Sequence, residues 1–143
     1  MRDHLEDAGV GEGITFFDEP DAAAPNTLSA HVLMMWGTAA ADVDESALAE
    51  RLFHANHVAC ENIGDPDVLV RIAGESGLAP EDVRARLAAH EDEARVKERI
   101  AESVARGVSG VPFFVIDDRL AISGAQPAEV LASAFARIAQ GDA

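Results

Sequence analysis

Apolar residues recur every three or four positions between residues 26 and 106, which predicts a series of amphipathic helices. The predicted helices begin at Asn26 or Thr27, Asp44, Asp65–Pro66, Pro80 and Glu91. Polar caps and first-turn prolines of this kind are typical of helix starts. The apolar residues expected on inner faces include Leu48, Leu52 and Phe53 in the helix from Asp44. In the helix from Glu91 they include Val96, Ile100 and Val104. This part of the chain therefore indicates a helical domain.

The pattern changes in the last part of the chain. Val111–Ile116 is an almost unbroken apolar run of strand length, and Asp117–Arg119 after it predicts a turn. Leu120 and Ile122 then alternate with smaller residues, so the two segments predict a β-hairpin. Pro127 opens a final amphipathic helix.

The predicted strand Phe113–Ile116 is apolar on both faces and requires cover on both. A two-stranded hairpin is marginally stable by itself. We therefore expect a homodimer or a heteromer, in which a strand from outside this chain pairs with Phe113–Ile116.

The charge balance limits the possible partners. The chain has 11 Lys and Arg against 26 Asp and Glu, a formal net charge of −15. A surface this acidic argues against binding nucleic acid or an anionic membrane. No apolar run approaches transmembrane length, and the charged start, Met1–Asp7, lacks the apolar stretch of a signal peptide. We therefore expect a cytoplasmic protein.

Cys60 is the one cysteine in the sequence, so an internal disulfide is excluded. It follows the predicted helix from Asp44, whose C-terminal dipole disfavours a thiolate. The interpretation favoured here is a small, partly buried residue at a helix end. The alternative is a soft-metal site, because His54, His57 and Cys60 are spaced by three. No fourth ligand is evident nearby, so we predict no metal and no cofactor.

Several other residues have a structural and a functional interpretation. Trp36 and Met35 are expected in the core rather than against a cofactor. The acidic run Glu91–Glu93 is expected on a solvated face. His31 on the first helix is more often a packing or capping residue than a catalytic one.

The segment Gly107–Val115 joins a helix stop to the predicted strand, with Pro112 at the strand's start. Proline is tolerated there because the first residue of a strand need not donate to the ladder. An ordinary connection with a trans proline is the simplest interpretation, since only about 5–6% of X-Pro bonds in folded proteins are cis.

The motifs around this segment favour a different interpretation. Gly110-Val111-Pro112 followed by an apolar strand resembles the cis-proline loop of thioredoxin-fold proteins, and Ser123-Gly124-Ala125-Gln126-Pro127 resembles the FrnE-like branch of the DsbA family. The motifs upstream that are similar to that branch are Pro25–Leu28, Ala30-His31, Leu52-Phe53 with Ala55, and Asn62–Asp65. The resemblance runs in order across nearly the whole chain.

The resemblance implies an α/β protein with an incomplete thioredoxin-like fold. Residues 1–25 would hold the end of a helix and a connecting loop, residues 26–106 a helical insertion domain, and residues 107–143 the C-terminal half of the thioredoxin fold. It also implies substrate binding by Gly110, Val111, Pro112 and His31. The strand–helix–strand segment that carries Cys-x-x-Cys in the family has no counterpart here, so no residue is assigned a catalytic role.

The resemblance further implies a DsbA/FrnE-like thiol–disulfide oxidoreductase acting on a thiol or peptide substrate, inactive alone without its dithiol. One alternative is a non-catalytic thioredoxin-fold binding module. Another is a relative of the glutathione-dependent 2-hydroxychromene-2-carboxylate isomerases, which share the helical insertion. The role of Cys60 and of the neighbouring His54 and His57 stays open.

Overall fold

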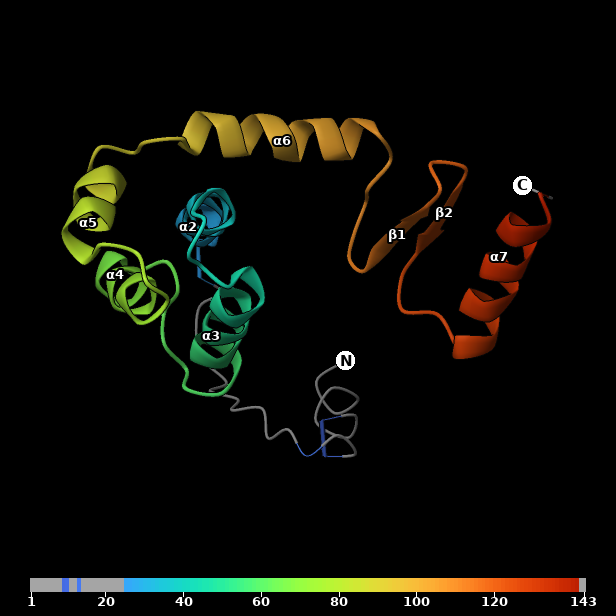
Figure 1. The fold of residues 1–143 in the computed structure, drawn as a ribbon, viewed down its shortest axis with the longest axis horizontal. Coiled ribbons are helices and arrows are strands. Elements are labelled where there is room, and N and C mark those ends of the chain that lie inside the picture. The colour runs from blue at the N-terminus through green and yellow to red at the C-terminus, as the bar shows by residue number, and fades with distance from the viewer. Residues whose placement is uncertain (1–8, 11–12, 14–24, 142–143) are drawn as a thin grey trace. The chain divides into compact units, whose positions relative to one another are not determined.

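The computed structural model of this chain describes residues 9–10, 13 and 25–141. The chain divides into two compact units, residues 1–96 and residues 97–143, and each is described by itself. The first unit contains α2 (Leu28–Ala39), α3 (Glu45–His57), α4 (Pro66–Glu75) and α5 (Pro80–Ala88), and α6 (Glu93–Ala105) begins there and continues into the second (Figure 1). The second unit adds β1 (Phe113–Ile116), β2 (Leu120–Ser123) and α7 (Ala128–Gln140). The helix end and loop predicted for residues 1–25 fall almost entirely outside the described residues.

Side chains hydrogen-bond to backbone N–H groups at the starts of α2, α3 and α4, where the sequence predicts helices. The Asp44 carboxylate accepts a hydrogen bond from the Ala47 N–H at 3.1 Å, and Asp65 accepts one from the Asp67 N–H at 2.8 Å. Of the two caps predicted for α2, Asn26 supplies the bond, because its side-chain oxygen accepts from the Leu28 N–H at 3.1 Å. Each bond satisfies an N–H group that the helix itself leaves unpaired.

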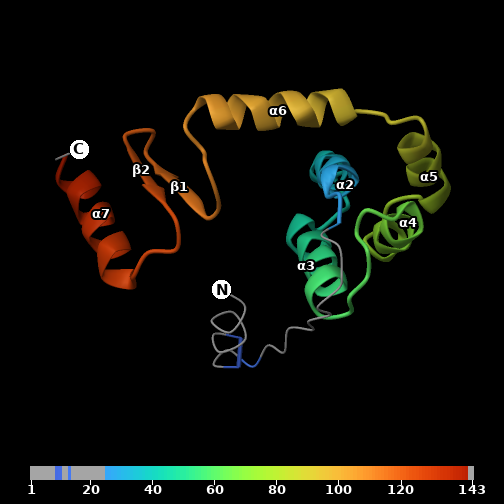
Figure 2. The same cartoon turned by 180° about the vertical axis from the view of Figure 1, so that it is seen from behind.

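The core of the first unit lies among α2, α3 and α4, with α5 packed against α4 (Figure 2). Leu33, Leu48 and Leu69, one from each of these three helices, have no exposed surface. α2 and α3 approach closely at Gly37, where an added Cβ would overlap the Leu48 side chain.

Three of the residues predicted on inner faces are exposed. Phe53 is 64% exposed, and Ile100 and Val104 of α6 are 48% and 63% exposed. The prediction was wrong for Phe53 because the helices around α3 cover its Leu48 and Leu52 side and leave Phe53 at the rim of a groove. Val96, Ile100 and Val104 were predicted on the inner face of α6, but only Val96 belongs to the first unit's core. The prediction was therefore wrong for Ile100 and Val104.

Trp36 is buried, as predicted, and its polar edge is satisfied. Its indole Nε1–H donates to the Asp92 carboxylate at 2.9 Å, and the Arg86 guanidinium lies 3.9 Å above the centre of the ring system. Arg86 also pairs with Glu91 at 2.7 Å. The prediction of a solvated acidic run was therefore wrong for Asp92, because a buried indole N–H needs an acceptor.

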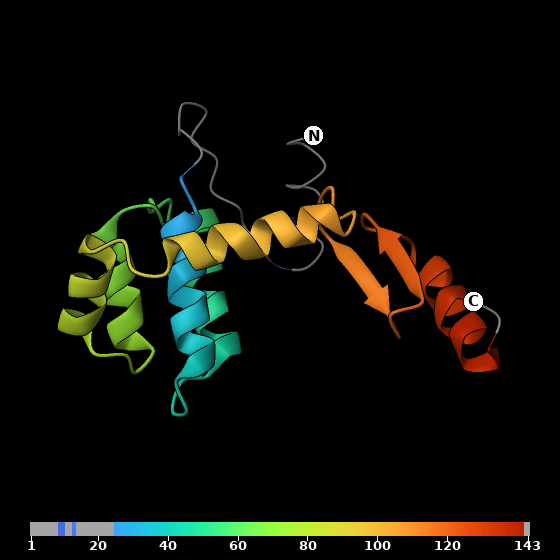
Figure 3. The ribbon, with the colours of Figure 1, turned by 90° about the horizontal axis from the view of Figure 1, so that it is seen from above.

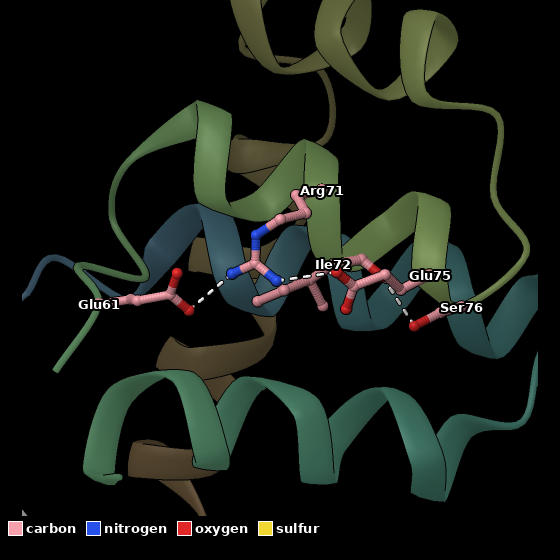
Figure 4. A network of polar contacts seen from close by, with 5 residues as sticks. All are labelled: Glu61, Arg71, Ile72, Glu75 and Ser76. Carbon is pink, nitrogen blue, oxygen red and sulfur yellow. Dashed lines mark hydrogen bonds and ion pairs between the residues drawn. The ribbon is translucent and has the colours of Figure 1, made fainter. Parts of the chain in front are cut away.

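A second polar network ties α4 to the segment after α3 (Figure 4). Arg71 pairs with Glu61 at 2.6 Å and with Glu75 at 2.9 Å, and the Ser76 hydroxyl donates to the Ile72 carbonyl at 2.8 Å. The hydrogen bond with Glu75 is the main cause of a raised pKa at Arg71, and the bond with Glu61 adds to it.

The predicted hairpin is present in the second unit. β1 and β2 pair antiparallel, with Phe113 opposite Ser123 and Ile116 opposite Leu120 (Figure 3). Asp117 and Asp118 form the turn with φ of 54° and 51°, a left-handed conformation that aspartate tolerates better than most residues. Among the described residues β1 pairs with β2 alone, and Phe114 and Val115 are 40% and 58% exposed.

α7 begins after Pro127, as predicted, and ends at Gln140, where Gly141 caps it with a left-handed φ of 80°. Leu120 and Ile122 of β2 face Val130 and Ala134 of α7 across an open hollow of about 400 Å³. The Arg119 guanidinium donates to the Gly141 carbonyl at 3.1 Å and so links the start of β2 to the end of α7. Across the described ranges, no helix has the length and apolar character needed to cross a bilayer.

Candidate substrate-binding loop

The loop that carries Gly110, Val111 and Pro112 begins where α6 ends. Gly107 has a left-handed φ of 92°, and its N–H donates to the Val104 carbonyl at 2.9 Å. The Val108 N–H donates to the Ser103 carbonyl at 3.1 Å, so the last turn of the helix is capped by the backbone. This turn directs the chain away from the helix and toward β1.

The Val111–Pro112 peptide bond is cis. The Pro112 carbonyl accepts a hydrogen bond from the Gly124 N–H at 2.9 Å, which extends the hairpin by one bond beyond β1. Val111 is 90% exposed, and no described residue forms a hydrogen bond with its backbone N–H or carbonyl. The loop therefore presents a peptide unit to solvent next to a residue that the hairpin holds in place.

The segment Ser123–Pro127 supplies that anchor. Gly124 has a left-handed φ of 84°, and the Gln126 side-chain amide donates to the Ser123 carbonyl at 2.9 Å. Glycine is favoured at this φ because a side chain there would crowd the backbone. Two motifs that are separate in the sequence, at residues 110–112 and at residues 123–127, are therefore joined by one backbone hydrogen bond.

His31 lies in the first unit, whereas Gly110, Val111 and Pro112 are neighbours in the second. It is exposed on α2 and lines a groove of about 410 Å³ together with Met34 of the same helix and with Phe53 and His57 of α3. Sequence reasoning missed this lining role for Phe53 and His57. Their spacing of four places both on one face of a helix, which was the available signal.

Comparison with known families covers the part of the chain that contains both motifs. Residues 1–136 match the model of the DsbA-like thioredoxin domain. This chain belongs to the DsbA-like thioredoxin family. The predicted incomplete thioredoxin-like α/β fold is thereby confirmed, with a mostly helical chain and a two-stranded antiparallel sheet in its described part.

A solved structure agrees with this DsbA-like assignment. The chain is similar to a probable DsbA oxidoreductase from Streptomyces coelicolor, with 33% sequence identity and a TM-score of 0.75 over 99% of this chain. The match covers 59% of the Streptomyces coelicolor chain, so the DsbA-like chain spans about three fifths of that protein's length. A search of curated proteins finds no match.

Cys60 of this DsbA-like chain lies beyond the end of α3, as predicted from its position after the Asp44 helix. The expectation of partial burial was wrong, because Cys60 is exposed and has a left-handed φ of 53°. In the ranges that the structure describes, His54, His57 and Cys60 do not form a metal-binding cluster, and neither does any other group of three His, Cys, Asp or Glu residues. The soft-metal alternative therefore has no support in this geometry.

Proposed function

We propose that this chain is the substrate-binding part of a FrnE-like thiol–disulfide oxidoreductase, with Gly110, Val111 and Pro112 as the site for a thiol or cysteine-containing peptide. The observation that carries the proposal is the backbone of Val111. The residue as a whole is 90% exposed, its N–H and carbonyl have no partner among the described residues, and it directly precedes a residue fixed by the hairpin. An exposed peptide unit of this kind can pair with the backbone of an extended peptide.

The anchor at Gly124 supports this role for Val111. Because the Pro112 carbonyl is already bonded to Gly124 at 2.9 Å, a bound peptide would pair with Val111 instead. Ordering such a site in advance lowers the entropic cost of binding. His31 is proposed as a second substrate contact, on the ground that it is exposed and lines a groove in the helical unit.

The redox step requires groups that this sequence does not contain. In dithiol–disulfide exchange, a thiolate attacks the substrate disulfide and forms a mixed disulfide while releasing one substrate thiol. A second thiol then resolves the mixed disulfide, so the substrate gains two electrons and the dithiol becomes a disulfide. The sequence contains no cysteine other than Cys60 that could act as this second thiol. We therefore propose that the dithiol belongs to a strand–helix–strand segment outside this sequence, and the greater length of the Streptomyces coelicolor relative supports this.

The exposed strand β1 supports an assembly with a second polypeptide. Within the described residues, one edge of β1 pairs with β2 and the other edge has no strand beside it. We propose that a strand from another copy or from another protein pairs there, which would also cover Val115, now 58% exposed. Light scattering should then give a mass above that of the 15.1 kDa chain. A monomer that unfolds cooperatively would contradict this assembly.

Amide chemical shifts can test the proposed site directly. The full chain is titrated with an alkyl-capped tripeptide whose central cysteine is joined by a disulfide to a second copy of the tripeptide. We expect shifts in the amide signals of Gly110 and Val111 and none in the signals of α5. The matched control is the same tripeptide with serine in place of cysteine, which should bind more weakly. If neither peptide moves the signals of these two residues, the proposal is wrong.

Insulin reduction tests the missing dithiol. The chain alone should show no activity above the uncatalysed rate, because it lacks a resolving thiol. Adding a strand–helix–strand segment that carries Cys-x-x-Cys, in the same tube or fused before residue 1, should produce activity. Activity of the chain alone at the level of the fused protein would contradict the proposal.

A further inference from the structure

Burial is divided unequally between the two units. Every buried apolar residue in the described part of the chain except Ala134 lies between Ala30 and Val96, within the first unit. The large apolar side chains of the second unit that are 40–63% exposed are Ile100, Val104, Phe114, Val115, Val130 and Phe135. Burial of apolar surface is the main favourable contribution to folding. The second unit, taken by itself, therefore has almost no core.

Other sources of stability for the second unit are few. A two-stranded hairpin is marginally stable in water, and domains below roughly 70–80 residues commonly rely on a disulfide, a metal or oligomerisation. Cys60 is the one cysteine of the sequence and lies outside residues 97–143, so no internal disulfide can hold this unit together. Its described residues contain no group of three His, Cys, Asp or Glu placed to bind a metal. Association with another polypeptide is the remaining source of stability.

The free edge of β1 has the geometry to receive another strand. The Pro112 carbonyl accepts from the Gly124 N–H, and the register continues with Phe114 opposite Ile122. Antiparallel ladders alternate between hydrogen-bonded and non-hydrogen-bonded pairs, so the backbone N–H and carbonyl groups of Phe113 and Val115 point away from β2. These outward groups are the ones that a strand beside β1 would bond.

The charge of the second unit favours a second copy of this chain as the source of that strand. Residues 97–141 contain five Lys and Arg and five Asp and Glu, whereas residues 25–96 contain five Arg and thirteen Asp and Glu. Phe113–Ile116 contains no charged residue and no proline, the residues that commonly keep edge strands apart. Two copies can therefore approach at β1 without the like-charge repulsion that contact between two acidic helical units would cause.

We propose that residues 107–141 are ordered only when a strand pairs with the free edge of β1, and that in a solution of this chain alone the strand is β1 of a second copy. A two-fold axis at Phe114 would pair Phe113 of each copy with Val115 of the other and bond the outward groups of both. The proposal rests on the proposed function, because it makes the binding loop at Gly110–Pro112 a property of the assembled protein. Order in the second unit then depends on protein concentration.

Hydrogen exchange tests the proposal on the full chain. Exchange is followed by mass spectrometry of peptic fragments across a dilution series, and light scattering gives the mass at each concentration. We expect the amides of α2, α3 and α4 to be protected at every concentration. The amides of β1, β2 and α7 should be protected in the dimer and should exchange on the order of tenfold faster, or more, as the chain dissociates.

Two variants at Val115 and their matched controls at Ala121 test the edge itself. Val115 and Ala121 lie opposite each other, and their N–H groups point to opposite edges of the hairpin. Val115→Pro removes an outward N–H of β1, and Val115→Lys places a charge on the strand that would pair. Both should keep the chain monomeric and leave residues 113–140 unprotected. Ala121→Pro and Ala121→Lys make the same changes at the outer edge of β2, and at least one of them should still dimerise.

Four results would overturn the inference. They are protection of residues 113–140 in a monomer, the lack of a dimer at every concentration, dimerisation of both Val115 variants, and loss of protection in the helical unit in step with the hairpin. The proposed function fails differently. A protected dimer whose Gly110 and Val111 signals do not respond to the disulfide-linked peptide contradicts the proposed function and leaves this inference standing, whereas a protected monomer that binds the peptide contradicts this inference alone.

Discussion

The backbone N–H of Gly124 donates to the carbonyl of Pro112 at 2.9 Å, and this bond joins the motif at residues 110–112 to the motif at residues 123–127. Gly124 reaches this position with a φ of 84°, and the Gln126 side chain closes the turn on the Ser123 carbonyl. The bond uses the Pro112 carbonyl, whereas the N–H and carbonyl of Val111, a residue that is 90% exposed, have no partner among the described residues. The geometry of the candidate site thus depends on a glycine twelve residues away from the proline along the chain.

Gly124→Ala should loosen this anchor. A left-handed φ costs a residue with a side chain roughly 1–2 kcal/mol, and Gly124 has a φ of 84°. We expect faster hydrogen exchange at the amide of residue 124 and at the amides of β1. Gly110→Ala is the control, because a Cβ at Gly110 would meet nothing within 4 Å and its φ is not left-handed. Equal exchange rates in the two variants would count against the anchor.

Gly37→Ala should destabilise the helical unit. An added Cβ would overlap the Leu48 side chain, which has no exposed surface. Overpacking of a core typically costs about 1–3 kcal/mol, and urea unfolding followed by circular dichroism would measure the loss. Thr38→Ala, at the exposed neighbouring position, should change stability by less than about 0.5 kcal/mol.

The overlap itself is tested by a double variant. Leu48→Ala alone should destabilise because it opens a cavity, yet combined with Gly37→Ala it should cost less than the sum of the two changes. If the two destabilisations were strictly additive, the Cβ at position 37 and the Leu48 side chain would not overlap.

Asp92→Ala should destabilise the packing around Trp36. The indole N–H would lose its acceptor at 2.9 Å, and an unsatisfied buried donor costs about 1–3 kcal/mol. Trp36 is the only tryptophan, so its fluorescence reports directly on this site during unfolding. Asp92→Asn keeps an oxygen acceptor and should cost less than Asp92→Ala.

Glu91→Ala is the control for the Asp92 variants, because among the described residues the Glu91 carboxylate pairs with Arg86 alone, at 2.7 Å, and both side chains are partly exposed. An exposed ion pair contributes about 0–1 kcal/mol. If Glu91→Ala lowered the free energy of unfolding as much as Asp92→Ala does, the role assigned to the hydrogen bond between the Trp36 indole and Asp92 would be contradicted.

Arg71→Ala should lower the free energy of unfolding only slightly, and added salt should reduce that difference. Its pairs with Glu61 and Glu75 are partly exposed, and such pairs contribute about 0–1 kcal/mol each. The pKa of Arg71 is raised, chiefly by the bond with Glu75, so the stabilisation from its charge is present below its ordinary pKa and is lost only as pH rises through the higher folded value. We therefore expect no titration of this effect near neutral pH. In 1 M NaCl the difference between Arg71→Ala and the unchanged chain should shrink.

Local sequence was sufficient to predict where the secondary structure begins and turns. Asp44 and Asp65 cap the helices predicted for them, because each bonds a backbone N–H within three residues. The hairpin and its Asp117–Asp118 turn were predicted for the same reason, since turn conformation depends on the residues in the turn. The predicted start of α6 differs from the observed one by two residues, because the helix begins at Glu93 rather than at Glu91. His90 and Asp92, just before that start, have left-handed φ angles.

Burial was not predictable in the same way. Phe53, Ile100 and Val104 satisfy the helical pattern as well as Leu48 and Val96 do, yet they are exposed. Whether an apolar face is covered depends on which other helices reach it, and spacing along one helix contains no information about that. The same limit explains Asp92, whose partner Trp36 lies 56 positions away.

The sequence by itself determined the helix starts, the hairpin, the proline loop and the absence of a second cysteine, because each depends on composition or on neighbours a few residues apart. Only the tertiary structure decided that Gly124 anchors Pro112, that Trp36 needs Asp92, and that Phe53 lines a groove beside His31. These relationships join residues separated along the chain, and the free energy that selects them comes from packing and from hydrogen bonds formed only in the folded protein.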